Sequence, residues 1–170
     1  MIGKLKNEII KGLHAYTGLK VVDTDNNYKK PKRPFYSYKI TSIKTNVSGE
    51  GNYSSDFPKS LDKRFKYDYR EKVELQPQVV ISFNCYSDDI AECMDKIYQA
   101  WDYFKHGGND LLALDNIIVV RTEDITDRTI VLDDRYEYRY GFDVELRFLH
   151  EIERRRETIE TYKFKRGNDI

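Results

Sequence analysis

The side chains that most often perform chemistry in proteins are few and scattered in this sequence. Three histidines, His14, His106 and His150, stand in no metal-binding spacing. Two cysteines, Cys85 and Cys93, are too few for a disulfide framework, and their separation does not match a metal pair. Cys85 falls on the apolar side of an expected strand, where a small core thiol fits. We therefore predict no catalytic residue, no metal site and no cofactor.

The segment that begins at Asp23 resembles the start of a calcium-binding loop. Asp23, Asp25 and Asn27 occupy alternate positions, as the first three ligands of such a loop do. A calcium loop also needs glycine at its sixth position and glutamate at its twelfth, where this sequence has Tyr28 and Pro34. The match therefore fails. Glycine-rich phosphate loops and nucleophile-elbow motifs are absent from the sequence as well, so an enzymatic function has no positive support.

Two basic clusters could bind phosphate groups: residues 29–33, and the run Arg154, Arg155 and Arg156. Acidic residues stand close to both clusters and weaken their electrostatic fields. Over the whole chain 29 Lys and Arg balance 29 Asp and Glu, so the formal net charge is zero. This balance argues against a uniformly basic nucleic-acid binder.

The chain has 170 residues, which suits one domain with a sizeable core. Aromatic residues are abundant, with 14 Tyr, 8 Phe and 1 Trp. Tyrosine suits strand faces and interfaces that are apolar on one side and wet on the other. The charged amino-terminal segment lacks the apolar core of a signal peptide, and no window approaches the roughly 18 apolar residues of a membrane span. We expect synthesis in a reducing cytoplasm and no membrane partner.

Two segments have the apolar periodicity of amphipathic helices. Residues 2–16 place apolar side chains on one helical face, and Gly18 follows as a helix-ending residue. Residues 90–104 repeat apolar side chains at intervals of three and four, after the capping segment 87–89. The second pattern is the strongest helix signal in the sequence. Both helices need an apolar surface to pack against.

Alternating apolar and polar residues predict several strands: 35–43, 65–75, 79–86 and 117–120. The turn at 76–78 separates two of them, and we interpret 65–75 and 79–86 as consecutive antiparallel strands that could form one hairpin. Residues 109–114 are interpreted as a turn, and the polar segment 124–134 is left unassigned.

Two segments are predicted to be extensions of the single domain that spans residues 1–170. Residues 44–63 are the longest unpatterned part of the chain, which is typical of a mobile or functional loop. Residues 150–170 form a charged carboxy-terminal extension, in which 158–164 could be a last strand.

The most regular pattern is a predicted strand over residues 136–148. Apolar residues, mostly aromatic, occupy every second position, and Gly141 is the single gap in the charged set between them. The charged residues alternate in sign and lie on the opposite face from the aromatic ones. They are Arg135, Glu137, Arg139, Asp143, Glu145 and Arg147. We expect the aromatic face to pack under the helix of 90–104 and to form the core.

The order of these elements resembles that of bacteriophage tail terminator and neck terminator proteins. Three stretches carry the resemblance: Arg-Pro-Phe-Tyr-Ser-Tyr at 33–38, Pro-Gln-Val-Val-Ile-Ser-Phe at 77–83 leading into the helix of 90–104, and Arg-Tyr-Gly-Phe-Asp-Val at 139–144. The last is similar to the Glu-Arg-x-Gly-Phe-Asp-Val type of ending in this family. The resemblance spans roughly residues 2–165.

The resemblance implies an α+β fold: a mainly antiparallel, mixed sheet with two principal helices on one face. It also implies a ring of subunits, most simply six, which caps the tail tube, ends its polymerisation and offers a docking surface to neck proteins. The implied partners are other copies of the chain, the tail tube protein and neck or head-completion proteins. DNA would pass through the lumen without specific binding. The protein would be made in the bacterial cytoplasm and reside in the tail or neck of the virion, without enzymatic activity.

A ring requires contacts between two different patches of neighbouring subunits. The alternating charges of residues 135–147 could fix how two neighbouring subunits align. A solvated sheet face explains these charges equally well. Tyr53 and Phe57 in the loop, and Arg154, Arg155 and Arg156 in the extension, are further candidates for contacts with neighbouring proteins. These segments could become ordered only against a partner.

Two other functions remain open from the sequence. Another neck or tail-completion connector of the same virion fits the pattern as well as a terminator does. A nucleic-acid binding module could instead use the aromatic strand as a stacking platform, which requires those aromatic side chains to be exposed.

Overall fold

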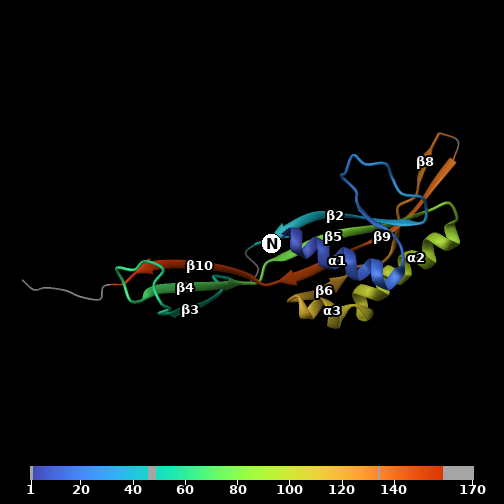
Figure 1. Ribbon diagram of the computed structural model, residues 1–170. Coiled ribbons are helices and arrows are strands. Elements are labelled where there is room, and N and C mark those ends of the chain that lie inside the picture. The colour runs from blue at the N-terminus through green and yellow to red at the C-terminus, as the bar shows by residue number, and fades with distance from the viewer. Residues whose placement is uncertain (1, 46–48, 134, 159–170) are drawn as a thin grey trace, which may run out of the picture. The chain divides into compact units, whose positions relative to one another are not determined.

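The computed structural model describes residues 2–45, 49–133 and 135–158 (Figure 1). The chain divides into two compact units. The main unit comprises residues 1–48 and 76–149, and the small unit comprises residues 49–75 and 150–170. The protein is of the α+β class, as predicted.

The main unit contains a seven-stranded sheet in the order β1-β2-β5-β9-β6, with β7 and β8 also paired to β9. Only β1 is parallel to its neighbour, and the other pairs are antiparallel. The strands are β1 (Val21–Asp23), β2 (Phe35–Lys44), β5 (Gln78–Ser87), β6 (Ile117–Thr122), β7 (Thr126–Asp127), β8 (Ile130–Leu132) and β9 (Arg135–Phe148). The long strand predicted from its alternation is therefore confirmed, and it is paired along both edges.

Both predicted helices are present in the main unit. The first, α1 (Ile2–Thr17), ends where Gly18 adopts a positive φ of 74° and its N–H donates to the His14 carbonyl oxygen. The second, α2 (Ile90–Asp102), begins at Asp89, whose carboxylate accepts from the Glu92 N–H. A π-helical turn (Tyr103–Gly107) and a short helix, α3 (Asn109–Leu114), follow α2. Residues 109–114 are thus a helix, and their interpretation as a turn was wrong.

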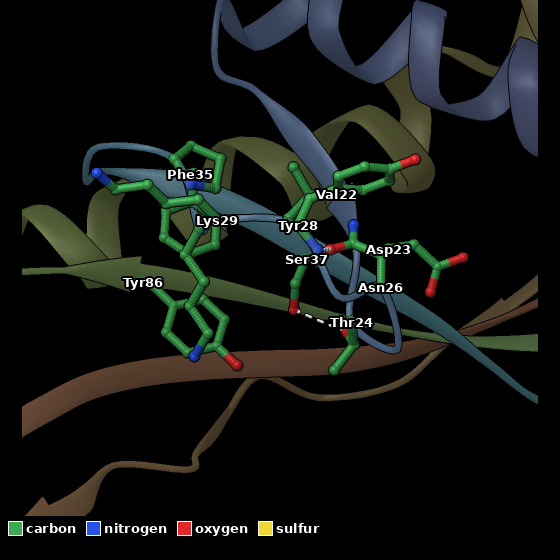
Figure 2. Close-up of a pocket in the computed structure, with 11 residues that line it drawn as sticks. Val22, Asp23, Thr24, Asn26, Tyr28, Lys29, Phe35, Ser37 and Tyr86 are labelled. Atoms are coloured by element: carbon green, nitrogen blue, oxygen red, sulfur yellow. Dashed lines mark hydrogen bonds between the residues drawn. The ribbon is translucent and has the colours of Figure 1, made fainter.

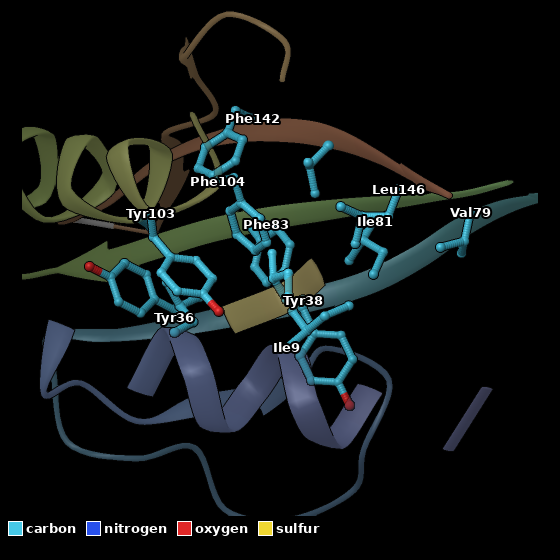
Figure 3. Close-up of a cluster of buried hydrophobic side chains, with 14 of the residues drawn as sticks. Ile9, Tyr36, Tyr38, Val79, Ile81, Phe83, Tyr103, Phe104, Phe142 and Leu146 are labelled. Atoms are coloured by element: carbon cyan, nitrogen blue, oxygen red, sulfur yellow. The ribbon is translucent and has the colours of Figure 1, made fainter. Parts of the chain in front are cut away.

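The hydrophobic core lies between these helices and one face of the main sheet (Figure 3). Phe83 of β5 is at its centre: its ring centroid lies 4.8 Å from that of Phe104 and 5.9 Å from that of Phe142. Cys93 and Ile97 of α2 and Leu13 of α1 belong to the same cluster. The expectation that the apolar face of the long strand packs under the helix of 90–104 is confirmed.

An ion pair joins α1 to β1. Lys6 Nζ lies 3.0 Å from Asp23 Oδ2. Burial alone would raise the pKa of Asp23, but hydrogen bonds from Lys6 and the Asp25 N–H, together with the charge of Lys6, outweigh burial and lower it. The hydrogen bond to Asp23 in turn raises the pKa of Lys6. The pair therefore stabilises the fold where both groups are charged.

We predict that Asp23→Asn destabilises the protein at neutral pH and has little effect at pH 3. A carboxyl group whose pKa is lower in the folded state than in the unfolded state stabilises the fold at pH values above its unfolded-state pKa of about 3.9. This contribution is lost as the pH falls through the folded-state pKa. The expected loss at pH 7 is up to about 1 kcal/mol, because the pair is partly exposed. Urea unfolding at pH 7 and pH 3 measures it, with Asp124→Asn as a control, because the exposed Asp124 carboxylate has no hydrogen bond or ion pair among the described residues. An equal loss at both pH values would contradict the prediction.

The small unit contains a three-stranded antiparallel sheet in the order β10-β4-β3. Its strands are β3 (Asn52–Asp56), β4 (Asp68–Leu75) and β10 (His150–Glu157), which lie side by side in Figure 1. No helix is present among the described residues of this unit.

The structure corrects one expectation about this region and adds detail to two others. Strands 65–75 and 79–86 form no hairpin: β4 pairs with β3 and β10, whereas β5 pairs with β2 and β9. The segment 44–63, predicted to be a mobile or functional loop, contains strand β3. The extension beyond residue 150 begins with strand β10, and the possible strand 158–164 falls outside the described residues after residue 158.

Candidate interaction surfaces

The charged face of β9 is largely paired within the chain. Glu137 is buried, and its carboxylate lies 2.5 Å from Arg33 Nη2. Glu145 is also buried and forms an ion pair with Lys44 of β2. A buried carboxylate is costly unless it is paired in this way. These two charges therefore hold β9 to residues that are distant in the sequence.

Asp143 belongs to a polar network on the same helix-free face. Arg128 donates to Asp143 Oδ1 at 2.9 Å, to Ser82 Oγ at 2.6 Å and to Asn84 Oδ1 at 3.0 Å. Arg139 Nε donates to the backbone carbonyl oxygen of Arg128. The network fixes the segment between β7 and β8 against the central strands. Arg128 lies in the polar stretch 124–134, where no periodicity distinguished it in the sequence.

Gly141 makes room for this network. A Cβ atom there would lie 2.4 Å from Asn84 Oδ1, 2.5 Å from the Phe83 carbonyl oxygen and 2.9 Å from Arg128 Nη1. Because one of these neighbours is backbone, the strand pair itself would have to shift. Gly141, the single gap in the alternating pattern, is therefore the position at which the side chains of Asn84 and Arg128 pass close to the β9 backbone.

We predict that Gly141→Ala destabilises the main unit by about 1–3 kcal/mol, the usual cost of overpacking. Gly3→Ala is the control for added volume, because a Cβ there meets no atom within 4 Å apart from its chain neighbours and the nearby backbone of its own helix, and this change should leave stability unchanged or raise it. Urea unfolding followed by circular dichroism measures both variants. Equal stabilities of G141A and the wild-type protein would contradict this account of the network.

Of the six charged residues predicted as contacts on this strand, the two at its ends are the most accessible. Arg135 and Arg147 are exposed, whereas Arg139 and Asp143 are half-buried. Arg139 also lies over the ring of Tyr86, with its guanidinium carbon 5.8 Å from the ring centroid. A contact with another subunit along this face would thus engage chiefly Arg135 and Arg147.

The aromatic side of the same strand is covered. Phe142 and Phe148 are buried in the core, and Tyr138 and Tyr140 are half-buried beside it. Only Tyr136, near the end of the strand, has most of its surface exposed, at 62%. A stacking platform for nucleic-acid bases needs exposed rings, so this face does not provide one.

The small unit brings together the remaining predicted contact residues. Tyr53 and Phe57 come from the β3 segment, and Arg154, Arg155 and Arg156 come from β10. They are about a hundred positions apart in the sequence, yet β4 pairs with both strands and places them in one small sheet. Sequence reasoning named these residues but gave no reason to expect them in the same sheet.

One face of the small sheet is a network of ion pairs. Arg70 forms an ion pair with Asp56, and Arg155 Nε lies 2.8 Å from a carboxylate oxygen of Glu153. The hydrogen bond from Arg70 lowers the pKa of Asp56, and that from Arg155 lowers the pKa of Glu153. Arg155 is also 4.0 Å from Asp68. Arg155 is therefore engaged within its own chain.

The basic cluster 29–33 borders a pocket of about 250 Å³ in the main unit (Figure 2). Phe35 and Tyr86 form its aromatic wall, with ring centroids 5.0 Å apart and nearly parallel planes. Lys30 Nζ lies 5.3 Å from the centroid of Tyr86. Arg33, by contrast, pairs with Asp88 and Glu137 and is unavailable to an anion. The cluster therefore supplies lysines at the rim of a pocket rather than a continuous phosphate site.

The remaining candidate groups have structural positions. Cys85 and Cys93 are free thiols in the core, and the hydrogen bond with Cys93 together with burial raises the pKa of Cys85, which keeps its thiol neutral. His14 Nδ1 donates to the Leu19 carbonyl oxygen at 2.7 Å, just beyond the end of α1. Among the described residues, no group of three or more His, Cys, Asp or Glu could hold a metal ion.

The main unit has a closed hydrophobic core, and the small unit is a sheet with exposed apolar side chains. Contiguous exposed apolar surface is typical of proteins that contact other proteins. The sequence profile of phage neck terminator proteins matches residues 7–168. The chain belongs to this family, a family of structural proteins of the phage neck. A search of curated proteins found no significant match. Membership indicates a location in the tail or neck of the virion, and no described helix is long and apolar enough to cross a membrane.

Proposed function

We propose that copies of this protein assemble into a ring, most simply of six subunits, that caps the tail tube and ends its polymerisation. The same ring offers a docking surface to neck or head-completion proteins. The observation that carries the proposal is the match to phage neck terminator proteins over residues 7–168. We also propose that residues 1–170 act as one domain in which the small unit is an appendage for contacts.

The charge distribution supports this function. The formal net charge is zero, and most charges on the helix-free face of the main sheet are paired within the chain. DNA affinity rises with the number of phosphates that a protein neutralises. A ring of nearly neutral subunits would therefore let DNA slide through its lumen without holding it.

Native mass spectrometry and negative-stain electron microscopy of the purified protein test the ring. Six copies of a 20.2 kDa chain have a mass of about 121 kDa. Tail tubes grown from tail tube protein with and without this protein test capping, and we expect elongation to stop when it is added. A ring that leaves tube growth unchanged would favour the neighbouring alternative, a connector elsewhere in the neck. A monomer in solution and on tubes would overturn the proposal.

A further inference from the structure

The second face of the small sheet carries apolar side chains that no other described residue fully covers, together with Glu71, Arg154 and Arg156. Tyr53 of β3, Val73 of β4 and Ile152 of β10 form one cross-strand row on this face. Tyr69 lies on the same side, and its ring centroid is 5.5 Å from that of Phe57. Tyr53 is 67% exposed, Phe57 61% and Ile152 47%. Exposed apolar side chains gathered on one face are typical of a surface that contacts another protein.

The two edges of the apolar face differ in chemistry. The β3 edge carries the aromatic side chains of Tyr53 and Phe57. On the β10 edge, Arg154 and Arg156 point to the same side, because they alternate with Arg155 and pair in register with Glu71 and Tyr69. An aromatic edge and a guanidinium edge attract each other through cation–π contacts.

The two arginines differ in their local partners. Arg154 Nη2 lies 2.5 Å from a carboxylate oxygen of Glu71. Arg156 is exposed, and its side chain makes no hydrogen bond or ion pair within the part of the chain that the structure describes. An exposed guanidinium group of this kind, beside exposed apolar side chains, can take part in a contact with another molecule.

The strand directions fit a contact between successive copies. Both β3 and β10 run antiparallel to β4, so they run in the same direction as each other. Each is an outer strand of the three-stranded sheet, and one edge of each has no partner strand among the described residues. Rotation about a ring axis preserves strand direction along the axis. The β3 edge of one copy can therefore lie beside the β10 edge of the next as a parallel neighbour.

We propose that the partner of this face is a second copy of the chain, with the aromatic β3 edge of one subunit packed against the arginine-bearing β10 edge of the next. This inference rests on the proposed ring. The contact is heterologous, since two different edges meet, as ring closure requires. A twofold pairing of two β10 edges would instead bring guanidinium groups of like charge together, which is unfavourable.

Engineered disulfides across the proposed contact test it directly. Ser55 lies on the apolar face between Tyr53 and Phe57, and Ser54 is its neighbour on the opposite face. Ser55→Cys is combined in turn with Ile152→Cys, Arg154→Cys or Arg156→Cys, which covers three registers. Within one copy these positions are separated by β4, too far for an intramolecular bond. Ser54→Cys with the same three partners is the matched control, and the native cysteines are buried.

We expect at least one Ser55→Cys pair to give a ladder of covalent oligomers on a non-reducing gel, several-fold more intense than its Ser54→Cys control. Native mass spectrometry of the wild-type protein tests the ring separately from the contact between the β3 and β10 edges. A ring whose Ser55→Cys variants give no ladder would overturn this contact and leave the ring intact. A monomer without cross-links would overturn both.

A second measurement does not depend on cysteine geometry. Tyr53→Ala should weaken subunit association at least tenfold in sedimentation or dilution experiments, because it removes an aromatic partner of the arginines. Ser54→Ala, on the same strand but the opposite face, should leave association unchanged. Far-ultraviolet circular dichroism confirms that both variants remain folded. Equal association of the two variants would count against the contact.

Discussion

A variant in which a two-residue Asn-Gly turn replaces residues 45–77, and in which the chain ends at Leu149, should fold cooperatively and remain monomeric. The reason is the register of the main sheet. Lys44, the last residue of β2, pairs directly with Gln78, the first residue of β5, so these antiparallel strands can be joined by a tight hairpin turn. All strands of the main sheet and its hydrophobic core remain in the shortened chain.

Assembly should be lost in this variant because the proposed contact between copies lies entirely in the small unit. Circular dichroism and urea unfolding measure folding, and analytical ultracentrifugation measures assembly beside the wild-type protein and Ser54→Ala. A variant without cooperative unfolding would show that the small unit belongs to the folding core. A variant that still forms rings would place the contacts in the main unit, where Arg135 and Arg147 are the exposed candidates.

The second large effect is expected from Phe83→Ala. Phe83 is fully buried, and its ring meets those of Tyr38, Phe104 and Phe142 from three different elements. Removal of a buried phenylalanine ring costs about 3–5 kcal/mol, a large part of the roughly 5–15 kcal/mol that stabilises a typical domain. We therefore expect a strongly reduced urea midpoint.

Tyr28→Ala is the control for this prediction. Its side chain is 84% exposed, so its removal should change stability by no more than about 0.5 kcal/mol. Both variants are compared by equilibrium urea unfolding, and the same dependence of the unfolding free energy on urea concentration is used for both. A midpoint for Phe83→Ala close to that of Tyr28→Ala would show that the aromatic cluster is not the stabilising centre of the main unit.

Local periodicity predicted the main unit well. The alternation over 136–148 identified β9 because a sheet with one buried face imposes a period of two on the sequence. The spacing over 90–104 identified α2 for the corresponding helical reason. The charged side of β9 was also placed correctly, opposite the core. Each of these inferences needed only residues that are close in the sequence.

Strand pairing was the part that local patterns could not determine. The segments 65–75 and 79–86 look like a hairpin because they are consecutive, alternate and flank a turn. The structure separates them, since β4 finds its partners in β3 and in β10, which lie far along the chain in opposite directions. Which strands pair depends on all the segments that could bind to a given strand edge, including distant ones. The pattern within one segment therefore does not identify its partner.

The polar strands were missed for a different reason. In β3 all five residues, Asn52 to Asp56, are exposed, so no buried face imposes an apolar period on the sequence. The same holds for β10, whose charges pair with β4 rather than pack in a core. Arg128 is a similar case: its role comes from Ser82, Asn84 and Asp143, which converge only in three dimensions.

The way the chain passes between its two units also has a mechanical consequence. The chain leaves the main sheet at the end of β2, re-enters it at the start of β5 and leaves it again at the end of β9. At these points Lys44, Gln78 and Arg147 lie in one cross-strand row. A pull on the small unit is therefore shared by three adjacent strands. A subunit linked to its neighbours through such an appendage, as proposed above, would therefore spread a load on the appendage over three strands of the main sheet.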